Sequence, residues 1–193
     1  KNIGNTKEEL KELADRFYSV NKWRYARQFY GKLLDIKDNS LVNYAHFKIA
    51  KTFEAEAVIE NAQAEYEILI QSPLRDEWSD NAYLELAKTY YTNAFNDPEY
   101  SIKKIKALID QYPKNSSTAR IKIYLAELYY IKKDLAKSLD EYRLILKEYP
   151  HDPLSSLVEE SIKKIEKELS NPEGIDHPIP LKDGSNPERI VLP

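Results

Sequence analysis

The three histidines are the side chains most suited to binding a metal ion or moving a proton, but their spacing favours neither role. His46 lies in a helix-like stretch, His151 follows Tyr149-Pro150, and His177 lies near the end of the chain. A metal site on a helix usually needs a second histidine three or four positions away, and none of the three has one. We therefore expect no metal site and no cofactor.

Acid–base and nucleophilic catalysis have no better support. Carboxylate pairs such as Glu8-Glu9 and Glu159-Glu160 could exchange protons, but on helix surfaces such pairs are usually solvated charge. The serines lack a G-x-S-x-G motif, and the 4 glycines form no phosphate-binding loop. We predict that the chain is not an enzyme.

The composition excludes further classes. The 193 residues carry 29 Lys and Arg against 32 Asp and Glu, a net charge of −3, and the two signs are interspersed. Because nucleic-acid binders concentrate positive charge, we expect no nucleic-acid partner. No apolar run approaches the roughly 18–20 residues that cross a bilayer. Cysteine is absent, which excludes disulfides and thiolate metal sites.

The sequence does contain a repeat. An apolar residue followed by alanine recurs at intervals of 36, 37 and 39 residues: Leu13-Ala14, Ile49-Ala50, Leu86-Ala87 and Leu125-Ala126. An aromatic residue follows each apolar member after four positions: Phe17, Phe53, Tyr90 and Tyr129. Later in each repeat stand Tyr30, Tyr66, Ile105 and Tyr142. Internal spacings of three and four are typical of helices with one buried face.

Capping residues and prolines predict where these helices begin and end. Thr6 with Glu9 has the pattern of a capping box. Asp97-Pro98 and Asp152-Pro153 have the pattern of a helix start, and prolines 73, 113 and 150 end the last helices of repeats two to four. Each repeat breaks near its middle, at 21–22, 55–57, 93–98 and 132–134. Each is therefore expected to be a pair of antiparallel helices.

This pattern resembles the tetratricopeptide repeat (TPR), which has Leu-Gly or Leu-Ala and Tyr on its first helix, Ala and Tyr or Phe on its second, and a closing proline. Repeat one (about 7–38) matches at Leu13, Ala14, Phe17, Trp23, Ala26 and Tyr30. Repeat four (about 119–150) matches at Leu125, Ala126, Tyr129, Leu135, Ser138, Tyr142 and Pro150. Repeats two and three span about 43–73 and 80–113.

The resemblance implies an all-α fold over residues 1–170. We expect a right-handed α-solenoid of about four TPR helix pairs, closed by a capping helix at 154–169. Residues 171–193 hold 5 of the 10 prolines and are expected to form an extended or disordered tail.

The resemblance also implies a binding surface, because TPR arrays bind partners on a concave face formed by the first helices. Its lining here would be Tyr18, Tyr44, Phe47, Lys51, Leu84, Lys88, Tyr91, Arg120, Ile123 and Tyr130. Rings and aliphatic groups with scattered charges suit an extended peptide or an amphipathic helix of a protein partner. The alternative is that several of these tyrosines only pack between neighbouring helices.

The closing segments "QYPKNSSTA" and "EYPHDPLSS" and the longer turn of repeat three are similar to those of bacterial envelope TPR proteins. These include the BamD-like lipoprotein of outer-membrane β-barrel assembly and the periplasmic TPR partner of the Tol–Pal system. The resemblance implies a scaffold in an envelope assembly complex, in the periplasm or on the inner leaflet of the outer membrane, with the cytoplasm as the other compartment open to it. Position 1 is Lys rather than Met, which fits a removed lipoprotein leader whose lipid anchor is the only membrane link we expect.

Two other roles stay open. The tail "HPIPLKDGSNPERIVLP" has the proline-rich character of a groove ligand, so the chain could be a TPR adaptor regulated by its own C-terminal segment. The chain could also be an accessory domain of a larger enzyme.

Overall fold

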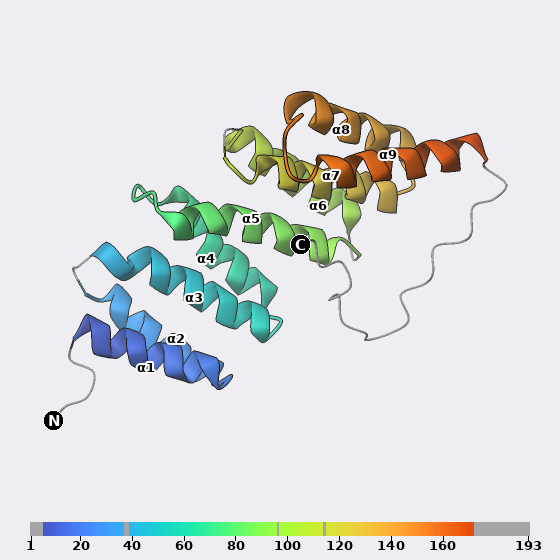
Figure 1. Cartoon of the computed structure of the whole chain (residues 1–193). Coiled ribbons are helices and arrows are strands. Elements are labelled where there is room, and N and C mark those ends of the chain that lie inside the picture. Colours follow the sequence, from blue (N-terminus) through green and yellow to red (C-terminus); the bar gives the residue numbers. More distant parts are fainter. Residues whose placement is uncertain (1–5, 37–38, 96, 114, 172–193) are drawn as a thin grey trace. The chain divides into compact units, whose positions relative to one another are not determined.

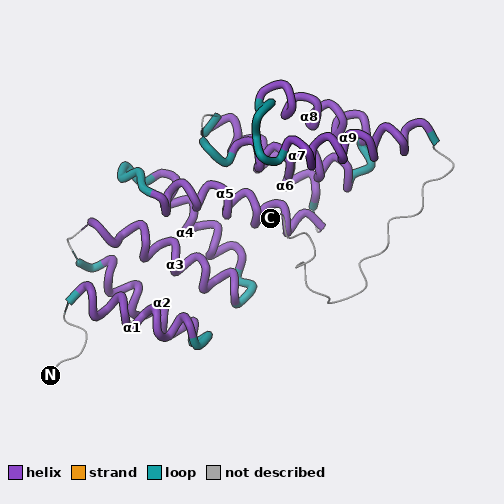
Figure 2. The backbone as a smooth tube through the Cα atoms, in the orientation of Figure 1, coloured by secondary structure: helices purple, strands orange, loops and turns teal. Residues whose placement is uncertain are grey.

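A computed structural model describes residues 6–36, 39–95, 97–113 and 115–171. Over these ranges the chain consists of α-helices and two short 3-10 helices, without a strand (Figure 2). The elements are α1 (Lys7–Ser19), α2 (Trp23–Leu34), η1 (Asn39–Leu41), α3 (Val42–Ala55), α4 (Ile59–Gln71), α5 (Glu77–Thr92), η2 (Asn93–Phe95), α6 (Pro98–Gln111), α7 (Thr118–Ile131), α8 (Leu135–Glu148) and α9 (Ser155–Ser170). No helix in these ranges is long and apolar enough to cross a membrane. The all-α prediction is confirmed.

The chain divides into two compact units, which are described separately. Of the described residues, the N-terminal unit comprises 6–36, 39–89 and 115–117, and the C-terminal unit comprises 90–95, 97–113 and 118–171. Helices α1 to α4 and most of α5 belong to the N-terminal unit, and the end of α5 with α6 to α9 belongs to the C-terminal unit (Figure 1). We call α1, α3, α5 and α7 the first helices of their repeats, and α2, α4, α6 and α8 the second helices.

In the N-terminal unit α1 packs against α2, α2 against α3, and α3 against α4. The repeat alanines Ala14 and Ala50 are completely buried, as are the repeat tyrosines Tyr30 and Tyr66. A small side chain lets two helices approach closely, and a large ring fills the space between neighbouring pairs. The packing positions predicted from the repeat are confirmed here.

In the C-terminal unit α7 packs against α6 and α8, and α9 packs against α8. Ala126 is completely buried, and the Ser138 hydroxyl on α8 donates a hydrogen bond to the Ala126 carbonyl at 2.8 Å. Val158 and Ile165 of α9 belong to the same core, while the acidic and basic side chains of this helix are mostly exposed. One apolar and one charged face make α9 the capping helix that the sequence predicts.

The turns inside repeats one, two and four share one geometry. Asn21, Ala57 and Lys133 have φ angles of 60°, 57° and 62°, in the left-handed region. The next residue donates its N–H at 2.9 Å to the carbonyl of the repeat aromatic: Lys22 to Phe17, Val58 to Phe53, and Asp134 to Tyr129. This bond closes the end of the first helix. Repeat three has η2 at this point, where the sequence predicts a longer turn.

Two predicted helix starts are confirmed. The Thr6 hydroxyl accepts the Glu9 N–H at 3.2 Å, and the Glu9 carboxylate accepts the Thr6 N–H at 3.4 Å, which completes the capping box of α1. The Asp97 carboxylate accepts the Tyr100 N–H at 2.9 Å, with Pro98 in the first turn of α6. Both caps satisfy N–H groups that have no partner within the helix.

The predicted start at Asp152-Pro153 is wrong. The Asp152 carboxylate accepts the Leu154 N–H at 2.8 Å within a turn, and α9 begins only at Ser155. The prolines at 73, 113 and 150 do follow the ends of α4, α6 and α8 as predicted. Of the predicted tail, residues 172–193 lie outside the described residues.

Candidate binding face

In the N-terminal unit, the carboxylate of Asp15 on α1 accepts three hydrogen bonds. Lys11 Nζ donates to Oδ2 at 2.7 Å, the Tyr30 hydroxyl donates to Oδ1 at 2.6 Å, and the Tyr44 hydroxyl also donates to Oδ1. Burial alone would raise the pKa of Asp15, but these bonds hold it below its ordinary value. Burial and the bond to Asp15 raise the pKa of Tyr30 and Tyr44, so both phenols remain donors. The cluster joins α1, α2 and α3.

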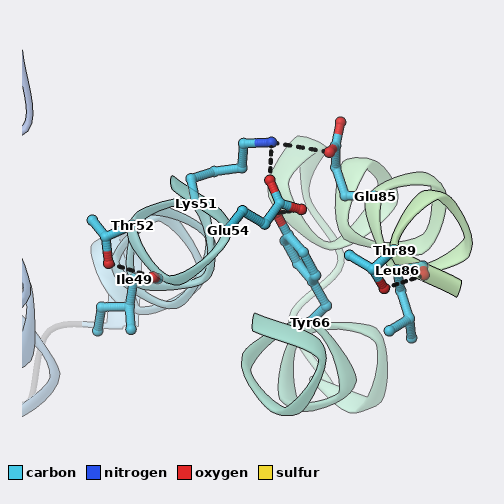
Figure 3. Close-up of polar contacts among 8 residues, drawn as sticks. All are labelled: Ile49, Lys51, Thr52, Glu54, Tyr66, Glu85, Leu86 and Thr89. Carbon is cyan, nitrogen blue, oxygen red and sulfur yellow. Dashed lines mark hydrogen bonds and ion pairs between the residues drawn. The ribbon is translucent and has the colours of Figure 1, made fainter. Parts of the chain in front are cut away.

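At the equivalent position of repeat two, the ammonium group of Lys51 is neutralised by carboxylates of the same chain. Lys51 Nζ on α3 lies between the carboxylates of Glu54 and Glu85, 3.0 Å from Glu85 Oε2 on α5 (Figure 3). The Tyr66 hydroxyl reaches the same group from α4 and donates to Glu54 Oε1 at 3.1 Å. Burial disfavours the charged form of Lys51, but the attraction of Glu85 and Glu54 raises its pKa.

Lys48, also on α3, is half-buried and differently placed. Its Nζ lies 4.2 Å from the centre of the Tyr18 ring and 5.9 Å from that of Tyr44. Burial lowers the pKa of Lys48, and the field of Asp15 opposes this shift. Among the described residues, Lys48 forms no ion pair with a carboxylate. Its ammonium group therefore rests on rings rather than on a counter-ion.

In the C-terminal unit, the first-helix face carries a pair of stacked rings beside the carboxylate of Glu127. Tyr91 at the end of α5 stacks on Tyr124 of α7, with ring centres 4.8 Å apart and planes inclined by 16°. Tyr91 hydrogen-bonds to Glu127 of α7, and burial raises the pKa of both groups. One turn further along α7, the Tyr130 hydroxyl donates to Glu168 Oε1 of α9 at 2.7 Å.

The ten residues predicted to form the contact surface all lie on first helices, at different depths. Lys88 is exposed, and the half-buried members are Tyr18, Phe47, Lys51, Leu84, Tyr91, Arg120 and Tyr130. Tyr44 and Ile123 are buried, with 6% and 1% of their surface exposed. Tyr44 lies in the core of the N-terminal unit and Ile123 in that of the C-terminal unit. We therefore leave these two side chains out of the proposed surface.

Those ten residues divide between the units. The members from Tyr18 to Lys88 lie in the N-terminal unit, and those from Tyr91 to Tyr130 lie in the C-terminal unit. Within the N-terminal unit, Phe47 packs against Tyr66 and Trp78, with ring centres 5.8 Å and 5.3 Å away. Phe47 thus has a packing role of the kind that the sequence left open for the aromatics.

The sequence interpretation missed Lys48 and Glu85. Each stands one position before the apolar residue of the apolar-Ala pair in its own repeat. Each interacts with a residue of the preceding repeat, namely the one that stands two positions after the apolar residue of that repeat's pair. Glu85 contacts Lys51, and Lys48 lies in the field of Asp15. This interaction between fixed positions of successive repeats could have been found by comparing the residue types at those positions.

Metal-binding geometry is not present in the described ranges, where no group of three His, Asp or Glu side chains is placed to hold an ion. His46 Nδ1 lies 2.7 Å from Glu65 Oε2, so α3 and α4 are joined there. His151 is exposed in the turn before α9, and His177 lies outside the described residues.

Comparison with known proteins identifies the fold. No protein-family model matches the chain, and no curated protein matches it. The solved structure of YrrB, a TPR protein with an unusual peptide-binding site, is similar with a TM-score of 0.53 and 13% identity, over 87% of this chain and 80% of that one. The TPR-like repeats of a Podospora anserina protein assigned as a kinesin light chain give a TM-score of 0.56 and 12% identity, over 86% and 87%.

A double mutant of MamA RS-1 gives a TM-score of 0.53 and 12% identity, over 90% of this chain and 99% of that one. At such low identity these likenesses bear on the fold alone. Together with the buried repeat positions, they establish that the chain has the TPR fold: successive helix pairs followed by a capping helix.

Proposed function

We propose that the chain is a non-catalytic scaffold that binds a peptide or helical segment of another protein on the faces formed by its first helices. The observation that carries this proposal is Lys48, a half-buried ammonium group on the ring of Tyr18 that forms no ion pair within the described residues. A partly desolvated charge without a counter-ion costs stability, so its presence at a surface favours a role in binding. An acidic group of a partner would provide the missing counter-ion.

The fold supports the same function. YrrB, whose fold the chain shares, has a peptide-binding site. The first-helix faces here combine half-buried rings with charged side chains, a composition suited to protein partners.

For the cellular setting, we propose an assembly complex of the bacterial cell envelope, in the periplasm or at the inner leaflet of the outer membrane. The support is the closing segments "QYPKNSSTA" and "EYPHDPLSS" and the longer turn of repeat three, which are similar to those of envelope TPR proteins. The partner would then be a segment of another envelope protein.

Site-specific photocrosslinking in cells of the source organism tests both proposals. A photoreactive residue would replace Lys88, exposed on first helix α5, and in a matched control Lys147, exposed on second helix α8. We expect a discrete crosslinked protein from position 88 and none from position 147. Equal products from both positions, or none from position 88, would contradict binding by the first helices.

The identity of the crosslinked protein, determined by mass spectrometry, decides the setting. Components of β-barrel assembly or of the Tol–Pal system would support the envelope proposal. Soluble cytoplasmic proteins alone would refute it and leave the scaffold function standing.

A further inference from the structure

Glu127 is a half-buried carboxylate on α7 without a positively charged partner. Its hydrogen bond comes from Tyr91, and burial raises its pKa. In the described part of the chain, no Lys, Arg or His forms an ion pair with it. A carboxylate removed from water without a cation is destabilising at neutral pH, because its charged form loses hydration that one phenol does not replace.

The side chains around Glu127 suit a cation. Tyr91 stacks on Tyr124, which precedes Glu127 by almost one helical turn, and Tyr130 follows by almost one turn. The Tyr130 ring already receives one ammonium group, since Lys164 Nζ of α9 lies 4.6 Å from its centre. The face of an aromatic ring attracts an ammonium or guanidinium group, and a carboxylate beside it can accept charge-assisted hydrogen bonds from the same group.

The equivalent positions of repeats one and two show what Glu127 lacks, whereas that of repeat three is the exposed Lys88. Asp15 also stands two residues after the apolar member of its repeat, and Lys11 at i−4 neutralises it at 2.7 Å. Lys51 at the same position of repeat two is neutralised by Glu54 and Glu85. The residue at i−4 from Glu127 is Ile123, which is buried in the core. The chain therefore supplies a counter-ion at two of these positions and leaves Glu127 without one.

We propose that Glu127 receives a lysine or arginine side chain from the bound segment of a protein partner, with the cation resting against the neighbouring tyrosine rings. This inference rests on the proposed scaffold function and names the chemistry that the C-terminal unit recognises. The occupant is a basic segment of another protein, because only a cation relieves the unpaired carboxylate while using the rings.

Peptide display on the full chain tests the proposal. A library of random peptides of about twelve residues, long enough to cross one helix face, would be selected on the wild type, on Glu127→Gln and on Glu160→Gln. Glutamine keeps an acceptor for Tyr91 and removes only the charge, and Glu160 is an exposed carboxylate of α9 that serves as the matched control. We expect one peptide position enriched in Lys or Arg with the wild type and the control, and no such enrichment with Glu127→Gln.

A double-mutant cycle tests whether the basic residue of the peptide contacts Glu127 itself. Replacing the basic residue of a selected peptide by norleucine should weaken binding to the wild type at least about tenfold, and should have little effect on Glu127→Gln. The wild-type half of this cycle changes only the peptide, so its result does not depend on how the variant folds. If the two changes reduce the binding free energy additively, the proposed contact between Glu127 and the peptide is refuted.

The other outcomes separate the two proposals. Selected peptides without a basic position, or with the same one on Glu127→Gln, would refute the role of Glu127 and leave the scaffold function intact. Failure of the wild-type chain to select any peptide would contradict the scaffold function, and the role of Glu127 with it.

Discussion

Asp15 and Glu127 occupy the same position of their repeats, two residues after Leu13 and Leu125, yet their environments shift their pKa values in opposite directions. Burial acts on both carboxyl groups. Lys11, Tyr30 and Tyr44 outweigh it at Asp15 and lower that pKa, whereas the bond from Tyr91 does not outweigh it at Glu127. The carboxylate at this repeat position thus forms a structural ion pair in the N-terminal unit, at Asp15, and has no counter-ion among the described residues in the C-terminal unit, at Glu127.

Glu127→Gln is expected to stabilise the chain near neutral pH. The folded state holds the Glu127 proton more tightly than the unfolded state, so this group favours folding at low pH and loses that contribution as pH rises through its raised folded pKa. The variant should therefore melt at a higher temperature than the wild type at about pH 7, and the difference should shrink towards about pH 4, where Glu127 is largely protonated.

Melting curves of both proteins, recorded by circular dichroism over this pH range, measure the difference. In the described part of the chain, the titrating groups that interact with Glu127 are the phenols of Tyr91 and Tyr142, whose raised pKa values keep them neutral throughout. A variant less stable than the wild type at neutral pH would mean that a cation such as Lys164 neutralises Glu127 in solution.

Asp15→Asn is expected to show the opposite pH dependence. The lowered folded pKa of Asp15 contributes stability above its unfolded pKa of about 3.9, and this contribution is lost as pH falls through the folded value. Replacing the charge should cost about 1.5–3 kcal/mol at neutral pH, the usual range for hydrogen bonds to a charged group. The cost, measured by urea unfolding, should diminish in acid, and a cost independent of pH would contradict the assignment.

The fold was predictable because its determinants repeat. Ala14, Ala50, Ala87 and Ala126 stand at equal positions of four repeats, and a feature that recurs at a fixed interval reveals its burial without knowledge of the neighbours. The start of α9 was mispredicted because Asp152 can cap a turn as well as a helix, and the sequence does not say which N–H its carboxylate will meet.

The candidate site was only partly predictable, because its chemistry depends on contacts between repeats. Spacing placed Tyr44 on a first helix, but its burial follows from the approach of Asp15, Tyr30 and Trp78 from three other helices. Likewise, the sequence shows that Lys51 and Glu127 are charged but not that only Lys51 has a counter-ion within the described residues. Charge pairing across repeats is a tertiary property and requires the structure.

Ala57→Gly is expected to stabilise the chain by about 0.5–1 kcal/mol, because φ at this position is 57° and a β-carbon is strained in the left-handed region. Glycine removes that strain, and its greater freedom in the unfolded state offsets part of the gain. The matched control is Ala64→Gly in the middle of α4, also exposed, where the same change should destabilise by about 1 kcal/mol. If chemical unfolding shows that both variants lose the same free energy of unfolding, the turn does not hold residue 57 in this conformation.

Ala126→Leu is expected to destabilise the chain by about 1–3 kcal/mol, because the added atoms have no room at the crossing of α7 and α8. The Ala126 carbonyl accepts a hydrogen bond from the Ser138 hydroxyl at 2.8 Å, so separating the two helices would also break a buried polar contact. The control is Ala136→Leu on the exposed side of α8, where leucine meets solvent and should change stability by less than about 0.5 kcal/mol. A thermal melt of Ala126→Leu that matches the wild type would refute the assignment of Ala126 to a close helix crossing.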